Sequence, residues 1–362
     1  MRAPVSTRQI FIVSLVSVIG FGIFATSSIG ASYMSTGAWI SILCAGIIFA
    51  RPAIFLTTLS RKHDGDTIFS YSQKIVGNLA GKLFSAIYAV FYLLFCAFAL
   101  SYFSHIVSMW ILPNTSFRFI AIFIVLVCAY ALSRGFTSVI RLVSFLGTLV
   151  VFTVIIIRII MIFSGDGTNM LPIFEKEVVI KGFIKGTSAV SVFFFGVGVL
   201  GIIPHNKNAK GSVFASMGGV LVSSLVLILV CLSCFSMLGP LRTGMYFDAV
   251  ALSMKAFDIS RVTFIQRADI IFIITWALLM LCAICLISHI PYAYIKALLP
   301  KNKKSLGEIA VCVPVFIIAA LLPNMEYAVD YLNILCMTLG IGALFIIPLI
   351  LFVAEVRNEK KK

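Results

Sequence analysis

Long apolar stretches recur along almost the whole chain, and this repetition limits the fold more than any other feature of the sequence. Hydrophobic residues make up 61% of the 362 residues and charged residues 11%, against about 25% charged in a typical soluble domain. The alternation over roughly ten residues that marks membrane barrel strands is absent. The sequence therefore predicts an all-α polytopic membrane protein with no separate soluble domain.

About ten stretches are each close to the roughly 20 residues that a helix needs to cross the hydrocarbon layer. The first is expected to remain a membrane span, because it lacks a small-residue cleavage site and outlasts the apolar part of a signal peptide. We treat residues 1–362 as a single permease-like domain. The predicted spans are residues 10–30, 38–60, 83–110, 117–133, 139–163, 183–204, 212–238, 268–290, 307–322 and 331–354.

The distribution of basic residues predicts the orientation. With both termini in the cytoplasm, the excess of Lys and Arg over acidic residues falls on inner loops and the tail, as the positive-inside rule requires. The formal net charge of +15 is dispersed over these short segments, which favours lipid headgroups over nucleic acid as the partner. Residues 63–82 are expected to form an interfacial helix inside, and residues 245–257 a surface helix outside.

Two glycine-interrupted apolar segments occur in the first and sixth predicted spans. Residues 19–24 read IGFGIF, and residues 195–201 read FGVGVLG. A break at mid-depth persists only where it faces protein or a watery cavity, and matched breaks in two halves mark the solute site of inverted-repeat transporters. Close helix packing is the alternative explanation of each segment. The pairing favours a five-helix inverted repeat, approximately 10–163 and 183–322/354, with helices 1 and 6 broken.

Two arginines fall inside predicted spans, where charge is costly and marks a functional site by default. Arg158 lies near the outer end of its span and is expected to snorkel outward to the interface. Arg51, followed by Pro52, is placed less favourably for snorkelling, so both explanations stay open. No acidic residue lies at clear mid-depth, which weakens a carboxylate proton relay. His105 and His289 are lone histidines for which packing suffices.

Motifs for catalysis or metal binding are missing. Two Cys-x-x-Cys pairs, Cys231/Cys234 and Cys282/Cys285, are predicted near opposite membrane faces, too far apart for one zinc ion. There is no phosphate-binding loop, metalloprotease helix or nucleophile elbow. We therefore expect no enzyme activity, no metal and no cofactor.

Several short motifs resemble one family of membrane proteins. The GFGIF of residues 20–24 resembles the first-helix signature of the amino acid–polyamine–organocation transporters. Residues 5–9 (VSTRQ), 111–115 (ILPNT) and 266–269 (QRAD), with Trp276 beyond, are similar to the B subunits of spore germinant receptors, the endospore germination permeases. The family usually has Glu-Arg at the start of the last motif, and Gln266 replaces that acid here.

The resemblance implies a germinant-sensing membrane subunit of the spore inner membrane. Its implied partners are an A subunit, a lipoprotein C subunit, the lipid bilayer and a small germinant, which is an amino acid, a sugar or a nucleoside. An ordinary proton- or sodium-coupled amino acid transporter is the alternative function. A structural membrane scaffold is a third and less economical explanation of the paired breaks.

The hypothesis for the site is a small solute bound between spans one and six. Freed amides at Gly20 and Gly22 would meet a carboxylate, hydroxyls would add hydrogen bonds, and carbonyls at Gly196 and Gly198 would meet an ammonium group. The predicted substrate-binding residues are Gly20, Phe21, Gly22, Thr26, Ser27, Phe195, Gly196 and Gly198. Leu200 and Phe345, with Phe21 and Phe195, would form a hydrophobic gate. Arg267 and Asp269 would orient the outer mouth. Packing and a surface ion pair are the respective alternatives.

Overall fold

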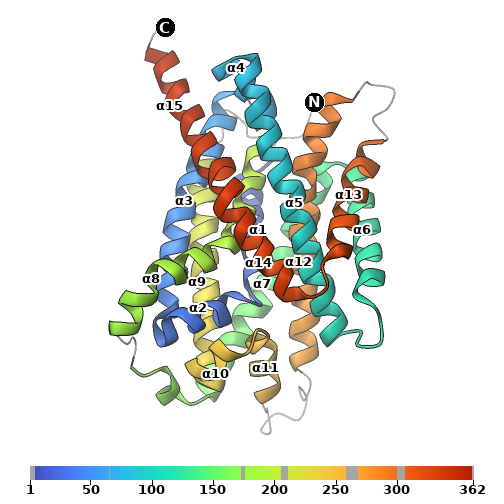
Figure 1. The fold of residues 1–362 in the computed structure, drawn as a ribbon. Helices are drawn as coiled ribbons and strands as arrows, with labels where there is room; N and C mark the ends of the chain where they lie inside the picture. The colour runs from blue at the N-terminus through green and yellow to red at the C-terminus, as the bar shows by residue number, and fades with distance from the viewer. Residues whose placement is uncertain are drawn as a thin grey trace.

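In the part of the chain that the structure describes, ten helical segments form the membrane bundle; the first is broken by a turn, and the sixth changes from α-helical to 3₁₀ geometry (Figure 1). The structure is a computed structural model that describes residues 5–64, 66–172, 176–204, 211–257, 268–299 and 306–360, and these residues contain helices but no strand. The segments are α1 (Thr7–Gly22) with α2 (Thr26–Met34), α3 (Ala38–Lys62), α5 (Asn78–Trp110), α6 (Phe117–Arg134), α7 (Phe136–Ser164), α8 (Lys176–Ser191) with the 3₁₀ segment η3 (Val192–Ile202), α9 (Ser212–Leu238), α12 (Ala268–Leu298), α13 (Gly307–Leu321), and α14 (Met325–Leu335) continuing through the π-helical η6 (Cys336–Gly340) and η7 (Gly342–Ile346) into α15 (Ile347–Lys360).

The predicted fold class is confirmed. Within the described ranges, eight helices are long and apolar enough to cross a membrane, and α1 and α13 are shorter apolar helices. Each predicted span coincides with one segment, although α5 begins at Asn78 and α12 ends at Leu298, several residues beyond the predicted limits. The predicted spans began at residue 83, after Lys82, and ended at residue 290, before Pro291. Backbone hydrogen bonding continues the helices past that point.

The first helix, α1, lies in the interior of the bundle. Every residue from Ile12 to Gly22 is buried, against α9, α12, α7 and η3. A capping box begins the helix: the Ser6 side chain accepts from the Gln9 backbone N–H at 3.3 Å, and the Gln9 side chain accepts from the Ser6 N–H at 3.0 Å. Two exposed backbone donors are satisfied in this way, so the short motif at residues 5–9 has a local physical role.

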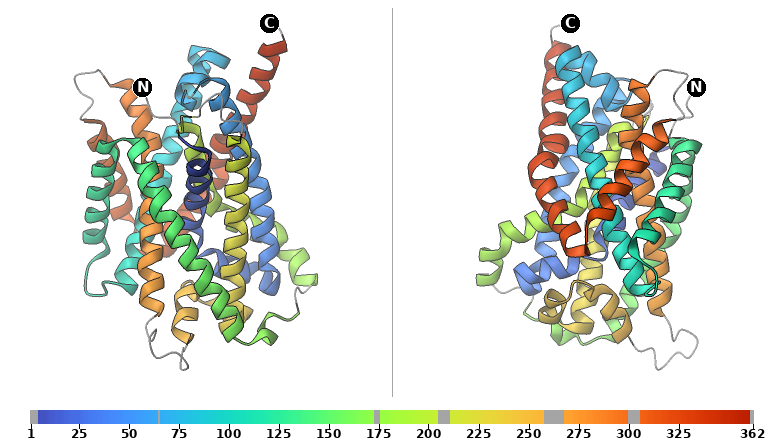
Figure 2. Two further views of the ribbon diagram at one scale, coloured as in Figure 1. Left: turned by 180° about the vertical axis from the view of Figure 1, so that it is seen from behind. Right: turned by 45° about the vertical axis from the view of Figure 1, so that its right-hand side comes forward.

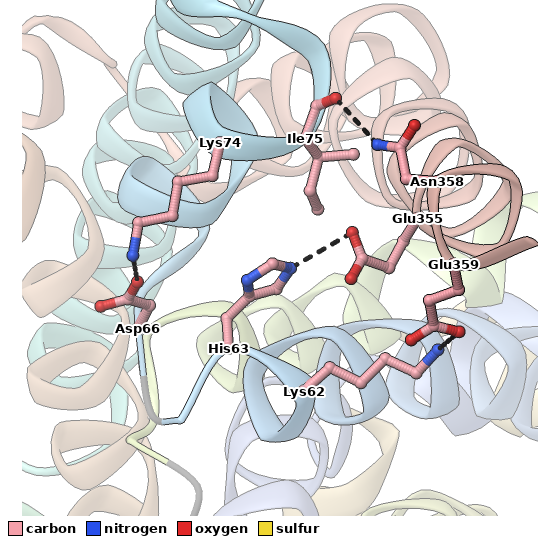
Figure 3. A network of polar contacts seen from close by, with 8 residues as sticks. All are labelled: Lys62, His63, Asp66, Lys74, Ile75, Glu355, Asn358 and Glu359. Atoms are coloured by element: carbon pink, nitrogen blue, oxygen red, sulfur yellow. Dashed lines mark hydrogen bonds and ion pairs between the residues drawn. The ribbon is translucent and has the colours of Figure 1, made fainter. Parts of the chain in front are cut away.

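The end of the bundle that carries α4 (Ile68–Val76) is also the end where α15 terminates (Figure 1). The helix predicted within residues 63–82 is present as α4, and its place at the interface stays a prediction. Polar contacts join this end of the bundle (Figure 3). Lys62 Nζ lies 2.7 Å from Glu359 Oε2, and His63 Nε2 lies 3.4 Å from Glu355 Oε2. These two contacts join α15 to the end of α3.

The opposite end carries two short helices, α10 (Pro240–Met245) and α11 (Ala249–Ala256) (Figure 1). The predicted surface helix within residues 245–257 is confirmed as α11, but one face of it is buried through residues such as Val250 and Met254. In the views of Figure 2, α8 lies at the edge of the bundle opposite α6 and α13. α11 therefore closes one end of the bundle, and α8 projects from its side.

Candidate functional site

The first break lies directly after the glycines at positions 20 and 22. α1 stays regular through Gly22, residues 23–25 form a turn, and α2 begins at Thr26. The expectation of free amides at Gly20 and Gly22 is therefore wrong, because both residues lie inside α1. The first turn of α2 supplies the free amides instead, since Ala25 at its N-cap has no side-chain oxygen to accept from them.

Gly20 also has a packing role. A Cβ at this position would lie 2.8 Å from the Ala283 Cβ and 3.0 Å from the Leu279 carbonyl oxygen of α12. The Gly20 carbonyl accepts a hydrogen bond from Trp276 Nε1 at 3.3 Å. The glycine thus lets α1 approach α12 closely, which was the alternative explanation of this segment.

Two hydroxyl side chains at the start of α2 are buried. Thr26 is 1% exposed, and its Oγ1 has no hydrogen-bond partner among the described residues. Ser27 is fully buried beside Cys231 of α9. An unpaired buried hydroxyl costs about 1–3 kcal/mol. Together with an uncapped helix N-terminus, the Thr26 hydroxyl is suited to an anionic or polar ligand.

The second break is the η3 segment, which follows α8 without a gap. All of its residues from Val192 to Ile202 are buried in 3₁₀ geometry, although such runs rarely exceed three or four residues. A Cβ at Gly196 would overlap the Ser17 carbonyl oxygen of α1 and lie 3.4 Å from the Phe21 ring. The two broken segments therefore pack directly against each other at this glycine, which is the close packing given above as the alternative, and the solute site between them stays a prediction.

Two tyrosines of α5 bind the carbonyl groups of η3. The Tyr88 hydroxyl donates to the Gly198 carbonyl at 2.5 Å, and the Tyr92 hydroxyl donates to the Phe195 carbonyl at 2.8 Å. The Gly198 carbonyl, which was expected to face a ligand ammonium group, is thus paired in this structure. The sequence analysis missed both tyrosines, although their i,i+4 spacing places two hydroxyls on one face of an apolar helix.

Three of the four predicted gate residues belong to a continuous aromatic cluster. Phe21 meets Phe95 at a ring-centroid distance of 5.3 Å, and Phe195 meets Phe345 at 6.4 Å. Phe91 of α5 links the two pairs, at 5.9 Å from Phe95 and 5.6 Å from Phe195. The fourth predicted residue, Leu200, is fully buried five positions further along η3. We name the following six phenylalanines the aromatic cluster: Phe21, Phe49, Phe91, Phe95, Phe195 and Phe345.

A side groove of about 400 Å³ ends at the aromatic cluster. Its volume is within the range of small-molecule sites. Phe49, Phe195 and Phe345 line it, and so do three hydroxyl residues of α8. Those hydroxyl residues are Thr187, Ser188 and Ser191. The groove lies between α3, α8 and the π-helical segments, and of the residues that line it the sequence analysis named Phe195 and Phe345.

The predicted charged residues are not all placed together. Arg158 does not snorkel outward: it is 0% exposed and points into the bundle, so that prediction is wrong. Arg51 is exposed on α3. Arg267 lies outside the described residues, and Asp269 lies in the first turn of α12. The outer-mouth prediction therefore stays a prediction.

The helix order and the breaks in segments one and six define a transporter-type inverted-repeat fold. In agreement, the chain is similar to the solved structure of Mhp1, a nucleobase-cation-symport-1 family transporter in a closed conformation with bromovinylhydantoin bound. The TM-score is 0.67 at 13% sequence identity, over 94% of this chain and 76% of that chain. This likeness is one of fold.

The sequence comparisons identify the family. A family profile described as "Spore germination protein" matches residues 4–328, and the chain belongs to this family of spore germination permeases. Spore germination protein YndE of Bacillus subtilis strain 168 is 20% identical over 88% of this chain and 94% of its own length. Spore germination protein GerQB of Bacillus cereus is 26% identical over 76% and 75%, respectively. The resemblance seen in the short motifs is thereby confirmed.

Proposed function

We propose that this integral membrane protein is the germinant-sensing subunit of a spore germinant receptor and binds a small nutrient where its two broken helices meet. The observation that carries the proposal is the direct packing of α1, at Ser17 and Phe21, against Gly196 of η3, together with the unpaired Thr26 hydroxyl at the start of α2. Membership of the spore germination protein family supports the germination role. The role is one of binding and signalling, without chemical conversion of the solute.

An amino acid is the ligand class that suits the start of α2. The backbone N–H groups of its first turn and the Thr26 hydroxyl would hydrogen-bond the carboxylate, and the helix dipole would favour the negative charge. Opening of the contact between α1 and η3 would admit the solute, because the two segments pack directly against each other in this structure. Water or ions would pass when the aromatic cluster separates.

The proposed location and partners follow from the family. Both termini lie in the cytoplasm in this proposal, which the excess of basic residues on that side supports. The membrane is the inner membrane of the spore. The chain acts there with a receptor A subunit and a lipoprotein C subunit.

The test replaces the Thr26 hydroxyl by a methyl group. Thr26→Val in an otherwise intact receptor is expected to raise the amino acid concentration for half-maximal germination about 10- to 100-fold, since a hydrogen bond to a charged group contributes about 1.5–3 kcal/mol. Thr148→Val is the matched control, because Thr148 is exposed on α7 and donates to the Ser144 carbonyl of its own helix. An unchanged response of Thr26→Val at equal subunit levels would remove the site assignment.

A coupled amino acid transporter is the second candidate function. The fold likeness to a cation symporter favours it. Counterflow of labelled amino acid in proteoliposomes separates the two candidates: accumulation of label in vesicles preloaded with unlabelled amino acid supports transport. Binding without accumulation supports the sensing role.

A further inference from the structure

Among the described residues, Arg158 is a charged side chain that is buried inside a membrane-spanning helix. It lies in α7 six residues before Ser164, where that helix ends, and it is 0% exposed. Removing a guanidinium charge from water costs several kcal/mol unless a counter-charge and hydrogen bonds compensate. The groups around this side chain therefore show which of its hydrogen bonds are made and whether a counter-charge is present.

The described partners of Arg158 Nη1 are all neutral side chains. Arg158 Nη1 donates to Ser233 Oγ of α9 and to Ser253 Oγ of α11, both at 3.3 Å, and lies 3.7 Å from Met161 Sδ. The group also stacks on the Phe272 ring of α12, with 4.2 Å from Cζ to the ring centroid. None of these partners carries a negative charge.

The opposite edge of the guanidinium group is unpaired. Arg158 Nε and Nη2 are buried and have no hydrogen-bond partner among the described residues, and none of the ion pairs in the described ranges involves Arg158. Nε and Nη2 together form the edge with which arginine binds a carboxylate through two parallel hydrogen bonds. This edge is thus held in place by Ser233, Ser253 and Phe272 and is left without an acceptor.

We propose that Arg158, with the two serines, forms a small-anion site that takes chloride or a carboxylate on its Nε/Nη2 edge. The site includes Ser253 of α11, a helix at the end of the bundle where α10 also lies (Figure 1). It is separate from the α1–α2 break, because its residues come from α7, α9, α11 and α12. An anion bound there would neutralise the charge and join α11 to the membrane helices.

An internal carboxylate is the rival occupant. Asp269 is the acidic residue nearest in sequence to Phe272 on α12, three positions before it. If Asp269 occupied the edge, the site would be a permanent ion pair and would exclude free anions. The experiment must therefore separate a bound solute anion from this side chain.

The test measures binding of radiolabelled chloride to the purified full-length protein in chloride-free buffer, by scintillation proximity. We expect saturable binding in the wild-type protein, loss of binding in Arg158→Gln and retained binding in Arg51→Gln, in which an exposed arginine is removed. Unlabelled chloride and formate compete with the label, and the stronger competitor shows whether the site prefers a halide or a carboxylate.

Three outcomes would overturn the proposal. In the first, the wild-type protein binds neither labelled chloride nor labelled formate in a saturable way. This outcome does not depend on the folding of any variant. Binding persists in Arg158→Gln. Binding is absent in the wild-type protein and appears only in Asp269→Asn, which would assign the edge to the internal carboxylate.

Discussion

Removal of the two tyrosine hydroxyls that bind η3 is expected to destabilise the protein measurably. Tyr88→Phe leaves the Gly198 carbonyl without its 2.5 Å donor, and Tyr92→Phe leaves the Phe195 carbonyl without its 2.8 Å donor. Both tyrosines are fully buried, so water does not replace the lost bond. A buried hydrogen bond contributes about 0.5–1.5 kcal/mol and an unpaired buried group costs about 1–3 kcal/mol. Interhelical bonds in membranes average about 0.6 kcal/mol with a maximum near 1.7 kcal/mol.

These magnitudes place the expected loss at about 1–2 kcal/mol of unfolding free energy for each substitution. The measurement is reversible denaturation of the purified protein in mixed micelles, with Tyr130→Phe as the matched control. Tyr130 is 60% exposed on α6, so its substitution should change the free energy by less than about 0.5 kcal/mol.

The double variant tests whether the two hydroxyls act as one unit. The rings of Tyr88 and Tyr92 are 4.8 Å apart, and they bind carbonyl groups of the same segment. Residues in one hydrogen-bond network couple by about 0.5 kcal/mol or more. Equal stability of both single variants and the Tyr130→Phe control would refute the conclusion that α5 holds η3 in place.

Two further predictions concern helix contacts outside the site. Gly147→Ala is expected to cost about 1–3 kcal/mol in the same denaturation assay, because the new Cβ would overlap the Val16 Cγ2 of α1. Adding Val16→Ala should recover part of that loss, and a purely additive double variant would contradict the overlap. Lys62→Gln is expected to change stability by less than about 1 kcal/mol, since Lys62 and Glu359 are 31% and 52% exposed. The small difference from wild type should vanish in high salt, and a salt-independent difference would show that the ion pair is not its cause.

The helices and the approximate position of the breaks could be predicted because both depend on residues that are neighbours in the sequence. A membrane helix is encoded by about 20 consecutive apolar residues, and a close approach of two backbones is encoded by glycine at the contact. Gly196 fulfils this role against Ser17, and Gly20 fulfils it against Ala283. The limits of α5 were less predictable, because a helix can continue past the apolar pattern without any local signal.

The partners of polar side chains could not be predicted in the same way. Tyr88 and Gly198 are 110 positions apart in sequence, so their hydrogen bond depends on how α5 and η3 pack. Arg158 is a similar case. Its position near the end of α7 favoured an outward direction, but Ser233 and Ser253 are 75 and 95 positions away and hold its guanidinium group inside.

The paired state of the η3 carbonyls has a consequence for any ligand with an ammonium group. Such a ligand would compete with the Tyr88 hydroxyl for the Gly198 carbonyl or use its second lone pair, because that hydroxyl already donates to it at 2.5 Å. Tyr88 and Tyr92 share α5 with Phe91 and Phe95, which link Phe21 of α1 to Phe195 of η3. A displacement of the tyrosines by ligand would therefore move the same face of α5 that packs the aromatic cluster. If a ligand displaced the tyrosines, its binding and the opening of that cluster would be coupled through α5, and the tyrosine variants would alter both.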